Sequence, residues 1–368
     1  MADTTVYPGQ TTEAHPELFD IRAMPEQPPK KLGQLPENAI RQFFEEGYVV
    51  VEDFFTPEEL DPCKTSINSL VDFLAEKLYR GGKIKNLYSE HGYEDRLTKL
   101  EEEFPGANVL LHKLGRLPQS FRNVWANERM LNVVEQLIGP NIAASPVWNL
   151  RTKTPTNEAT TVPWHQDCCY FDQSNYKTML ITAWIPLIDA TKETGCLEVG
   201  VKGHRTGRVA NHLAVYKDTW YPVMAEGELE DTLEVKEQKV CPVPYGGILL
   251  FSNVLPHRSI PNTSNKVRWS LDLRWQRPDA EYGFFGLKEG VVLRDNKNTN
   301  LKPNWDVFDS LDRHLIQKRN ISGVLEAPVD EFDTTIQGPW MTQWKIPHDN
   351  RHVIRHRQDK ESRDVMTP

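Results

Sequence analysis

Apolar residues recur every three to four positions in three segments of the first 140 residues, which is the spacing of one face of an α-helix. Gly47 ends the first segment, as glycine commonly does after a helix. The second segment begins with Thr56-Pro-Glu-Glu59, a capping box with proline at the first helical position. The predicted helices cover residues 37–46, 56–78 and 127–137, and an apolar run at 48–51 predicts a short buried strand.

From residue 144 onward the pattern changes to short apolar or alternating runs that are separated by turn residues. Many short strands without helices between them are typical of a β-sandwich or a jelly roll. The sequence therefore predicts a mostly β fold, in which the N-terminal helices buttress one face of a sheet. The predicted strands cover residues 147–152, 179–186, 195–199, 247–251 and 268–276.

The same patterns divide the chain into three parts. The first part is polar and rich in proline, which favours an extended arm over a domain. The last part is expected to contain one more helix, around residues 305–315, and a charged tail. The predicted parts are an arm at 1–35, a domain at 36–278 (helices in 36–140, jelly-roll core in 144–278) and a C-terminal extension at 279–368.

Composition excludes several classes of protein. The formal net charge is −9 and the sequence pI is about 5.7, so the basic surface that nucleic-acid binding needs is absent. No apolar run approaches the length of about 18 residues that a membrane span needs, and residues 1–8 do not resemble a signal peptide. Five scattered cysteines indicate reduced thiols, and the last residues are not a peroxisomal address. We expect a cytoplasmic protein with a small-molecule substrate, and the sequence does not indicate its oligomeric state.

The main candidate for a functional site is the stretch Thr161–Tyr170, where His165 and Asp167 are two residues apart. In a strand, side chains alternate between faces, so these two would point the same way. A third ligand must come from elsewhere, and His257, after the apolar run 247–251, is the best candidate. Two histidines and one carboxylate with open coordination positions form the facial triad of non-haem Fe(II) oxygenases. Taken by itself, the His-x-Asp spacing is equally compatible with a hydrogen-bonded strand histidine.

Arg268 and Ser270 share one face of the predicted strand 268–276. An iron oxygenase of this type needs an electron-donating co-substrate, and 2-oxoglutarate ends in a carboxylate that is remote from its metal-chelating end. A planar guanidinium can bind that carboxylate through two parallel hydrogen bonds, and a neighbouring hydroxyl can add a third.

Together these motifs resemble the phytanoyl-CoA dioxygenase-like family of Fe(II)/2-oxoglutarate oxygenases, from about residue 43 to about residue 278. The resemblance implies a double-stranded β-helix, which is the jelly roll of cupin-like proteins. The residues that carry the resemblance are Pro163–Asp167, Ile181–Leu187, Thr194–Leu197, His204, His257 and Arg268–Arg274.

The resemblance also implies roles for individual residues. His165, Asp167 and His257 would hold iron and leave positions for 2-oxoglutarate and O2. For one of the co-substrate residues, Lys153, a solvated lysine is a close alternative. The residues that would bind 2-oxoglutarate are Lys153, Trp184, Ser259, Arg268 and Ser270.

The implied reaction hydroxylates an unactivated C–H bond while 2-oxoglutarate is converted to succinate and CO2, with ascorbate as a candidate reductant. An acyl-CoA substrate, as in 2-hydroxylation of phytanoyl-CoA, would need a basic groove. The acidic insertion at 211–239, which is either a solvated loop or a flap over the site, favours a small metabolite or natural product instead. The alternative from a different class is a jelly-roll binding protein without turnover.

Three further features have structural explanations. Asp272 and Arg274 are expected to pair with each other, although one of them could meet the substrate. Cys168 and Cys169 are expected to be structural thiols, because iron(II) in such a site takes nitrogen and oxygen ligands. Histidines at four-residue spacing imitate a helical metal site in the tail, and no second metal is expected at His348, His352 and His356.

Overall fold

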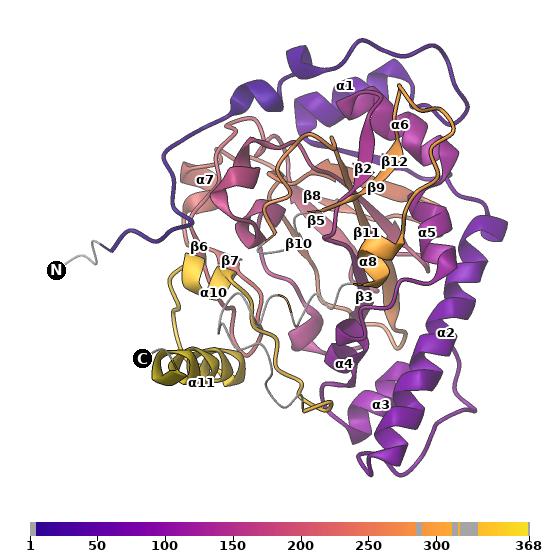
Figure 1. The fold of residues 1–368 in the computed structure, drawn as a ribbon, viewed down its shortest axis with the longest axis vertical. Coiled ribbons are helices and arrows are strands. Elements are labelled where there is room, and N and C mark those ends of the chain that lie inside the picture. Colours follow the sequence, from indigo (N-terminus) through magenta and orange to yellow (C-terminus); the bar gives the residue numbers. More distant parts are fainter. Residues whose placement is uncertain (1–4, 285–288, 311–315, 317–329, 367–368) are drawn as a thin grey trace.

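Two antiparallel sheets form the core of the computed structural model, in which residues 5–284, 289–310, 316 and 330–366 are described (Figure 1). The larger sheet has the strand order β1-β9-β4-β11-β2-β12, with β3 also paired to β11, and the smaller sheet has the order β10-β5-β8. The predicted mostly β jelly roll is confirmed. Its strands are β1 (Tyr48–Val51), β2 (Ile142–Ala144), β3 (Asn149–Lys153), β4 (Ile181–Pro186), β5 (Leu197–Gly200), β6 (His212–Leu213), β7 (Val223–Met224), β8 (Gln238–Cys241), β9 (Ile248–Ser252), β10 (His257–Ser259), β11 (Arg268–Gln276) and β12 (Val291–Arg294).

Helices from the first 140 residues cover the outer face of the larger sheet (Figure 1). Their apolar sides and the outward side chains of the strands form one continuous core. The predicted helix 37–46 is confirmed at the same bounds, and those at 56–78 and 127–137 are confirmed within two residues. The helices are α1 (Glu37–Glu46), α2 (Pro57–Arg80), α3 (Arg96–Glu103), α4 (Ala107–Lys113), α5 (Gln119–Trp125), α6 (Glu128–Ile138), α7 (Glu228–Asp231), α8 (Asp306–Asp309), α10 (Trp340–Gln343) and α11 (Arg351–Met366).

Strand β11 presents two different faces, because successive side chains of a strand point to opposite sides. One face is apolar and packs under the helices, where each buried side chain contributes about 1.5–3 kcal/mol. The other face is polar and turns toward the interior between the sheets. The apolar face carries Trp269, Leu271, Leu273 and Trp275, and the polar face carries Arg268, Ser270, Asp272 and Arg274, all of them buried.

The N-terminal arm runs across the surface of the jelly roll before it enters α1 (Figure 1). The Gly9 amide donates to the carbonyl of Gln343 (3.0 Å), and Ala14 forms an isolated β-bridge with Arg208. Phe19 is buried against the core. The arm therefore makes defined contacts over its length while its backbone stays mostly outside regular structure.

The C-terminal extension folds back onto the same jelly roll. Strand β12 adds an edge to the larger sheet by pairing with β2, and α10 and α11 lie near β6 and β7 (Figure 1). Of the helix predicted at 305–315, the four residues Asp306–Asp309 form α8, and residues 311–315 lie outside the described part of the chain. No helix in the described residues is long and apolar enough to cross a membrane.

Candidate metal centre and adjoining cavities

The stretch that carries His165 and Asp167 is not a strand, so that prediction is wrong. His165 forms an isolated antiparallel bridge with His257, in which each backbone amide donates to the other's carbonyl (3.0 and 2.9 Å). The chain then turns, and Asp167 begins a short 3-10 helix (Asp167–Tyr170) whose Cys168 amide donates to the carbonyl of Asn253. Gln166 points away and donates to the Arg208 and Val254 carbonyls. These bonds to distant backbone groups hold the turn, and the two ligands still converge.

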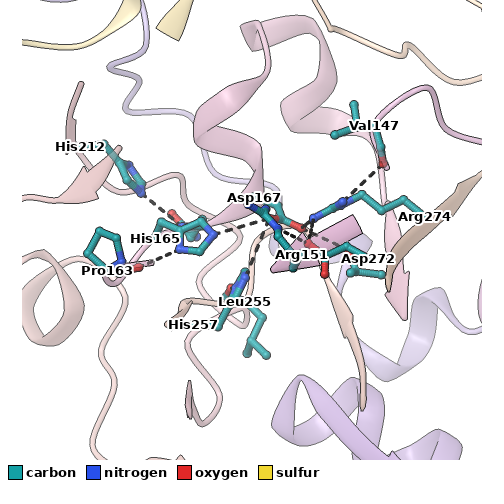
Figure 2. Close-up of polar contacts among 12 residues, drawn as sticks. Val147, Arg151, Pro163, His165, Asp167, His212, Leu255, His257, Asp272 and Arg274 are labelled. Carbon is teal, nitrogen blue, oxygen red and sulfur yellow. Dashed lines mark hydrogen bonds and ion pairs between the residues drawn. The ribbon is translucent and has the colours of Figure 1, made fainter. Parts of the chain in front are cut away.

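His165, Asp167 and His257 lie together in the interior, each almost fully buried (Figure 2). Their ligand atoms lie within 4.8 Å of one another, and this is the group with metal-binding geometry found among the described residues. Asp167 Oδ1 is 3.7 Å from His165 Nε2 and 3.9 Å from His257 Nε2. Two imidazoles and one carboxylate oxygen that face a common point can hold a divalent transition metal.

Both histidines are held in one tautomer by backbone carbonyls. The Nδ1 atom of His165 donates to the Pro163 carbonyl (2.8 Å), and that of His257 donates to the Leu255 carbonyl (3.0 Å) (Figure 2). With the proton on Nδ1, the lone pair on each Nε2 faces Asp167. Burial, with the neighbouring His165, lowers the pKa of His257 to about 3, so this imidazole is neutral at physiological pH.

Arg274 fixes the orientation of the Asp167 carboxylate. Its Nε and Nη2 atoms both donate to Asp167 Oδ2, at 3.0 and 2.8 Å, and Thr182 Oγ1 adds a third bond to the same oxygen (Figure 2). Oδ1 is thereby left to face the histidines. Burial by itself would raise the pKa of Asp167, but Arg274 and the two histidines outweigh it and hold this pKa well below its ordinary value.

The predicted pairing of Asp272 with Arg274 is present at ion-pair distance, but it is not the main contact of either residue. Arg274 approaches Asp272 only to 3.8 Å, whereas Asp272 Oδ2 accepts from Arg151 Nε at 2.8 Å. Cα atoms two residues apart in a strand are separated by about 7 Å, so each long side chain reaches a nearer partner on a neighbouring segment. Arg151 and the role of Arg274 were missed, because their partners are far away in the sequence.

Arg268 is buried on the polar face of β11 without an acidic partner within ion-pair distance among the described residues. Its Nη1 atom donates to Ser270 Oγ (2.7 Å), its guanidinium lies 5.1 Å from the centre of the Trp184 ring, and its Nε atom has no hydrogen-bond partner. Burial lowers the pKa of Arg268 to about 10, which leaves it charged at neutral pH.

Lys153 is paired with Arg268 in the register of β3 against β11, and its side chain is 1% exposed. Its Nζ atom donates to Thr161 Oγ1 (3.2 Å), and burial together with Arg268 holds the pKa of Lys153 well below its ordinary value. The stem passes Gly195, where φ is +83° and a Cβ atom would lie 2.6 Å from Lys153 Cδ. The lysine is thus not the solvated side chain of the alternative interpretation.

Two adjoining cavities meet at the candidate metal centre, and four residues line both: His112, Arg151, Trp220 and Arg274. We call the first the metal-side cavity, and it has about 700 Å³ of empty space. Four of the five predicted co-substrate residues line it, and Ser270 does not. In it, Ser259 Oγ accepts from the Val162 amide (2.9 Å). The second, the aromatic chamber, has about 650 Å³ and is lined by His112, Val147, Asn149, Arg151, Asp167, Tyr170, Phe171, Trp220, Arg274, Phe284, Ile336 and Trp340.

Residues 43–270, well over half of the chain, match the family described as phytanoyl-CoA dioxygenase (PhyH). The chain belongs to the phytanoyl-CoA dioxygenase family. This confirms the resemblance seen in the sequence and makes the protein an oxidoreductase of the dioxygenase type. The family match includes the three candidate ligands and Arg268, and it ends before Arg274 and the C-terminal extension.

Two relatives illustrate the similarity. A phytanoyl-CoA dioxygenase domain-containing protein 1 of Danio rerio is 24% identical over 265 residues, which cover 64% of this chain and 87% of that protein. A 1-deoxypentalenic acid 11-beta-hydroxylase of Streptomyces arenae is 25% identical over 175 residues, which cover 45% of this chain and 60% of that protein.

Solved structures of similar fold are iron-type oxygenases. The non-heme monooxygenase ThoJ covers 78% of this chain and 100% of its own, with a TM-score of 0.53 and 14% identity. EctD from S. alaskensis, solved with 2-oxoglutarate and 5-hydroxyectoine, covers 76% of this chain and 90% of its own, with a TM-score of 0.53 and 17% identity. At this level of identity the likeness establishes the shared jelly-roll fold of this phytanoyl-CoA dioxygenase family member.

The tail histidines of this family member have other roles than metal binding. The His348 Nε2 atom contacts the Lys217 carbonyl, and the His352 Nδ1 atom accepts from the Ile336 amide (2.9 Å). His352 and His356 are both buried. The three do not appear as a metal-binding group in the described part of the chain.

The acidic insertion at 211–239 is neither wholly a solvated loop nor wholly a flap over the site. Its charged residues, such as Glu226 and Glu230, are exposed, whereas Trp220 and Tyr221 are buried and line the metal-side cavity. The acidic composition dominated the sequence pattern, so the contribution of these two aromatic residues to the site was missed.

Proposed function

We propose that the protein is an Fe(II)- and 2-oxoglutarate-dependent dioxygenase that hydroxylates an unactivated C–H bond of a small metabolite or natural product. One atom of O2 would enter the product, and the other would enter the succinate formed from 2-oxoglutarate with loss of CO2. The observation that carries this proposal is the pair of buried basic side chains, Arg268 and Lys153, which have no acidic partner within ion-pair distance among the described residues and line the same cavity as the two histidines.

An uncompensated buried charge is costly, so such a pair is expected to receive an anion. Arg268 would bind the distal carboxylate of 2-oxoglutarate, with Ser270 holding the guanidinium and Trp184 covering it. The unpartnered Nε atom leaves one donor of the guanidinium free for such a carboxylate. An incoming anion would also raise the pKa of Lys153.

The residues present fit a bound iron(II), because both Nε2 atoms and Asp167 Oδ1 face one point and their other polar atoms are already satisfied. Bound iron would supply the redox chemistry with O2. Arg274 would keep Asp167 ionised and monodentate, and the surrounding aromatic residues would exclude water from the reacting carbon.

A small substrate is favoured over a CoA thioester. The arginines that line both cavities, Arg151 and Arg274, each have a carboxylate partner that offsets their charge, so they do not form the basic groove that the phosphates of CoA need. The relative from Streptomyces arenae, whose name specifies a free acid as its substrate, supports the same choice.

The test is succinate release by the purified chain with iron(II), 2-oxoglutarate and ascorbate across a panel of metabolites and acyl-CoA thioesters. Succinate that depends on iron and on one small metabolite, together with a product heavier by one oxygen atom, would support the proposal. Succinate stimulated only by acyl-CoA would instead indicate the acyl-CoA 2-hydroxylase. No turnover of 2-oxoglutarate under any condition would leave the jelly-roll binding protein.

A further inference from the structure

Aromatic side chains of the chamber come from separate segments of the chain and contact one another in pairs. Tyr170 and Trp340 meet edge to face with ring centroids 5.2 Å apart, and Phe171 meets Phe284 at 5.7 Å. Trp220 adds a further ring, which also lines the metal-side cavity. Among the residues that the structure describes, the chamber therefore offers flat apolar surfaces on several sides, next to the carboxylate of Asp167.

Hydrogen bonds hold these rings in place before any ligand binds. The indole Nε1 of Trp340 donates to the Trp220 carbonyl (3.0 Å), and that of Trp344 donates to the Cys169 carbonyl (2.8 Å). Gln343 donates to the carbonyl of Phe171 (2.8 Å). The C-terminal extension is thereby fastened to the loop that carries Asp167 and to the insertion, and its contacts define one wall of the chamber.

Rigid walls select rigid ligands. A flexible chain loses rotamer freedom when it is immobilised, whereas a fused ring system has little to lose and can stack against aromatic faces. The chamber encloses about 650 Å³ of empty space, part of it open to solvent. Polar side chains also line the chamber: His112, Arg151 and Arg274 are shared with the metal-side cavity, and Asn149, Asp167 and Tyr170 line the chamber alone.

We propose that the aromatic chamber binds the rigid, ring-bearing apolar body of the substrate, and that Trp340 of the C-terminal extension determines this specificity. An oxygen substituent of the substrate would lie at the junction, within reach of Arg151. The inference rests on the proposed function, because only that function makes the bound ligand a substrate. It adds the substrate class, a compact fused-ring molecule carrying an oxygen group, and it assigns a binding role to a segment outside the family match.

The test measures binding without turnover, on the metal-free full-length chain, by isothermal titration with three probes. These are 2-naphthoate as a fused-ring acid, octanoate as a flexible acid of similar size, and octanoyl-CoA. We expect 2-naphthoate to bind at least tenfold more tightly than octanoate or octanoyl-CoA. Trp340→Ala should weaken 2-naphthoate at least tenfold, and Trp340→Phe, which keeps a ring, should lose less.

Trp305→Ala is the matched control, since Trp305 belongs to the same extension but packs against Trp125 and lines neither cavity. It should leave 2-naphthoate affinity unchanged, and thermal melting of each variant separates lost binding from lost folding. If Trp340→Ala does not fold, Phe284→Ala tests another aromatic ring that lines the chamber. Equal or tighter binding of octanoate or octanoyl-CoA, an unchanged affinity in the chamber variants, or no binding by any probe would overturn the inference.

The two proposals fail separately. Tight 2-naphthoate binding without iron-dependent succinate formation would retain the chamber as a ring-binding site and reject the dioxygenase. Succinate formation with a flexible substrate would retain the dioxygenase and reject the chamber as a ring-binding site.

Discussion

Residues of the jelly-roll strands, many of them polar, line the metal-side cavity, whereas aromatic residues from short helices and loops line the chamber beside it. Lys153, Trp184 and Arg268 belong to strands that pair with one another, so the sheet itself sets their positions. Phe284, Ile336 and Trp340 lie beyond residue 270, where the family match ends. Under the two proposals, residues of the sheet bind the co-substrate. Residues beyond the family match then contribute to binding the substrate.

The largest expected effect comes from removing a metal ligand. His257→Ala or His165→Ala should abolish iron binding and turnover, a loss greater than the ~10–100-fold that changes in outer partners of a metal cost. The fold should persist, since the sheets close without metal. Iron content and succinate release measure the loss. His348→Ala, an exposed histidine, is the control that should change neither.

The same variants test the separation of the two cavities. If the chamber is independent, His257→Ala should still bind 2-naphthoate like the unchanged chain. Wild-type iron content and turnover in His257→Ala would falsify the assignment of the triad.

A smaller but still large effect is expected at Arg268. Arg268→Ala would leave the distal carboxylate of 2-oxoglutarate unpaired in a buried cavity, which costs about 2–5 kcal/mol. The KM for 2-oxoglutarate should therefore rise steeply while iron content and 2-naphthoate binding are unchanged. Arg258→Ala is the matched control, because this half-exposed arginine pairs with Glu198 and lines neither cavity. An unchanged 2-oxoglutarate dependence in Arg268→Ala would contradict the role.

Arg274 is expected to act through Asp167, and its loss should be felt as weaker metal binding. Arg274→Ala removes two hydrogen bonds from Asp167 Oδ2 and frees the carboxylate to rotate. Outer partners of this kind are worth about 10–100-fold in metal affinity. Titration with iron(II) or Mn(II) measures the change, and Arg274→Lys should recover part of it. Equal metal affinity in Arg274→Ala, with the fold intact, would show that Asp167 is oriented by other contacts.

The smallest effect concerns buried histidines, which occur in both the core and the extension. Burial lowers the pKa of His204, His352 and His356 from 6.5 to about 4. The unfolded chain therefore takes up protons between these pH values while the folded chain does not. The contribution of these histidines to the free energy of unfolding should be fully present above about pH 6.5 and should fall progressively toward pH 4. The slope is set by the difference in bound protons between the unfolded and the folded chain.

Urea unfolding at a series of pH values measures this slope. His204→Gln keeps a donor for the Phe44 carbonyl and removes one titrating group, so its stability should decline less steeply on acidification. A profile identical to that of the unchanged chain would show that His204 does not contribute.

The sequence predicted the candidate metal ligands and several residues that line the metal-side cavity, but little of the chamber, for a physical reason. The period-two spacing of Arg268 and Ser270 is a local property of a strand, and the structure joins the two side chains by a hydrogen bond. The strand predicted for His165 and Asp167 failed, because the turn depends on Asn253, about 85 positions away. The partner of Arg274 was missed for the same reason.

The wall of the chamber had no local signal at all. Trp340 contacts the backbone of Trp220, 120 positions earlier, and nothing in the spacing of either tryptophan marks that contact. The acidic residues near Trp220 indicated a solvent-exposed loop instead. Only the folded arrangement of the extension brings the two rings to one cavity.

The position of Trp340 after β11 in the chain has a consequence for biosynthesis. During translation the ribosome releases strands β1 to β11, with both histidines and Arg268, long before residues 336–344 emerge. A nascent chain can therefore complete its metal ligands while the neighbouring cavity still lacks a wall. Premature loading with metal would then place reactive chemistry beside an open site, and late docking of the extension would mark the moment at which a newly made molecule becomes selective.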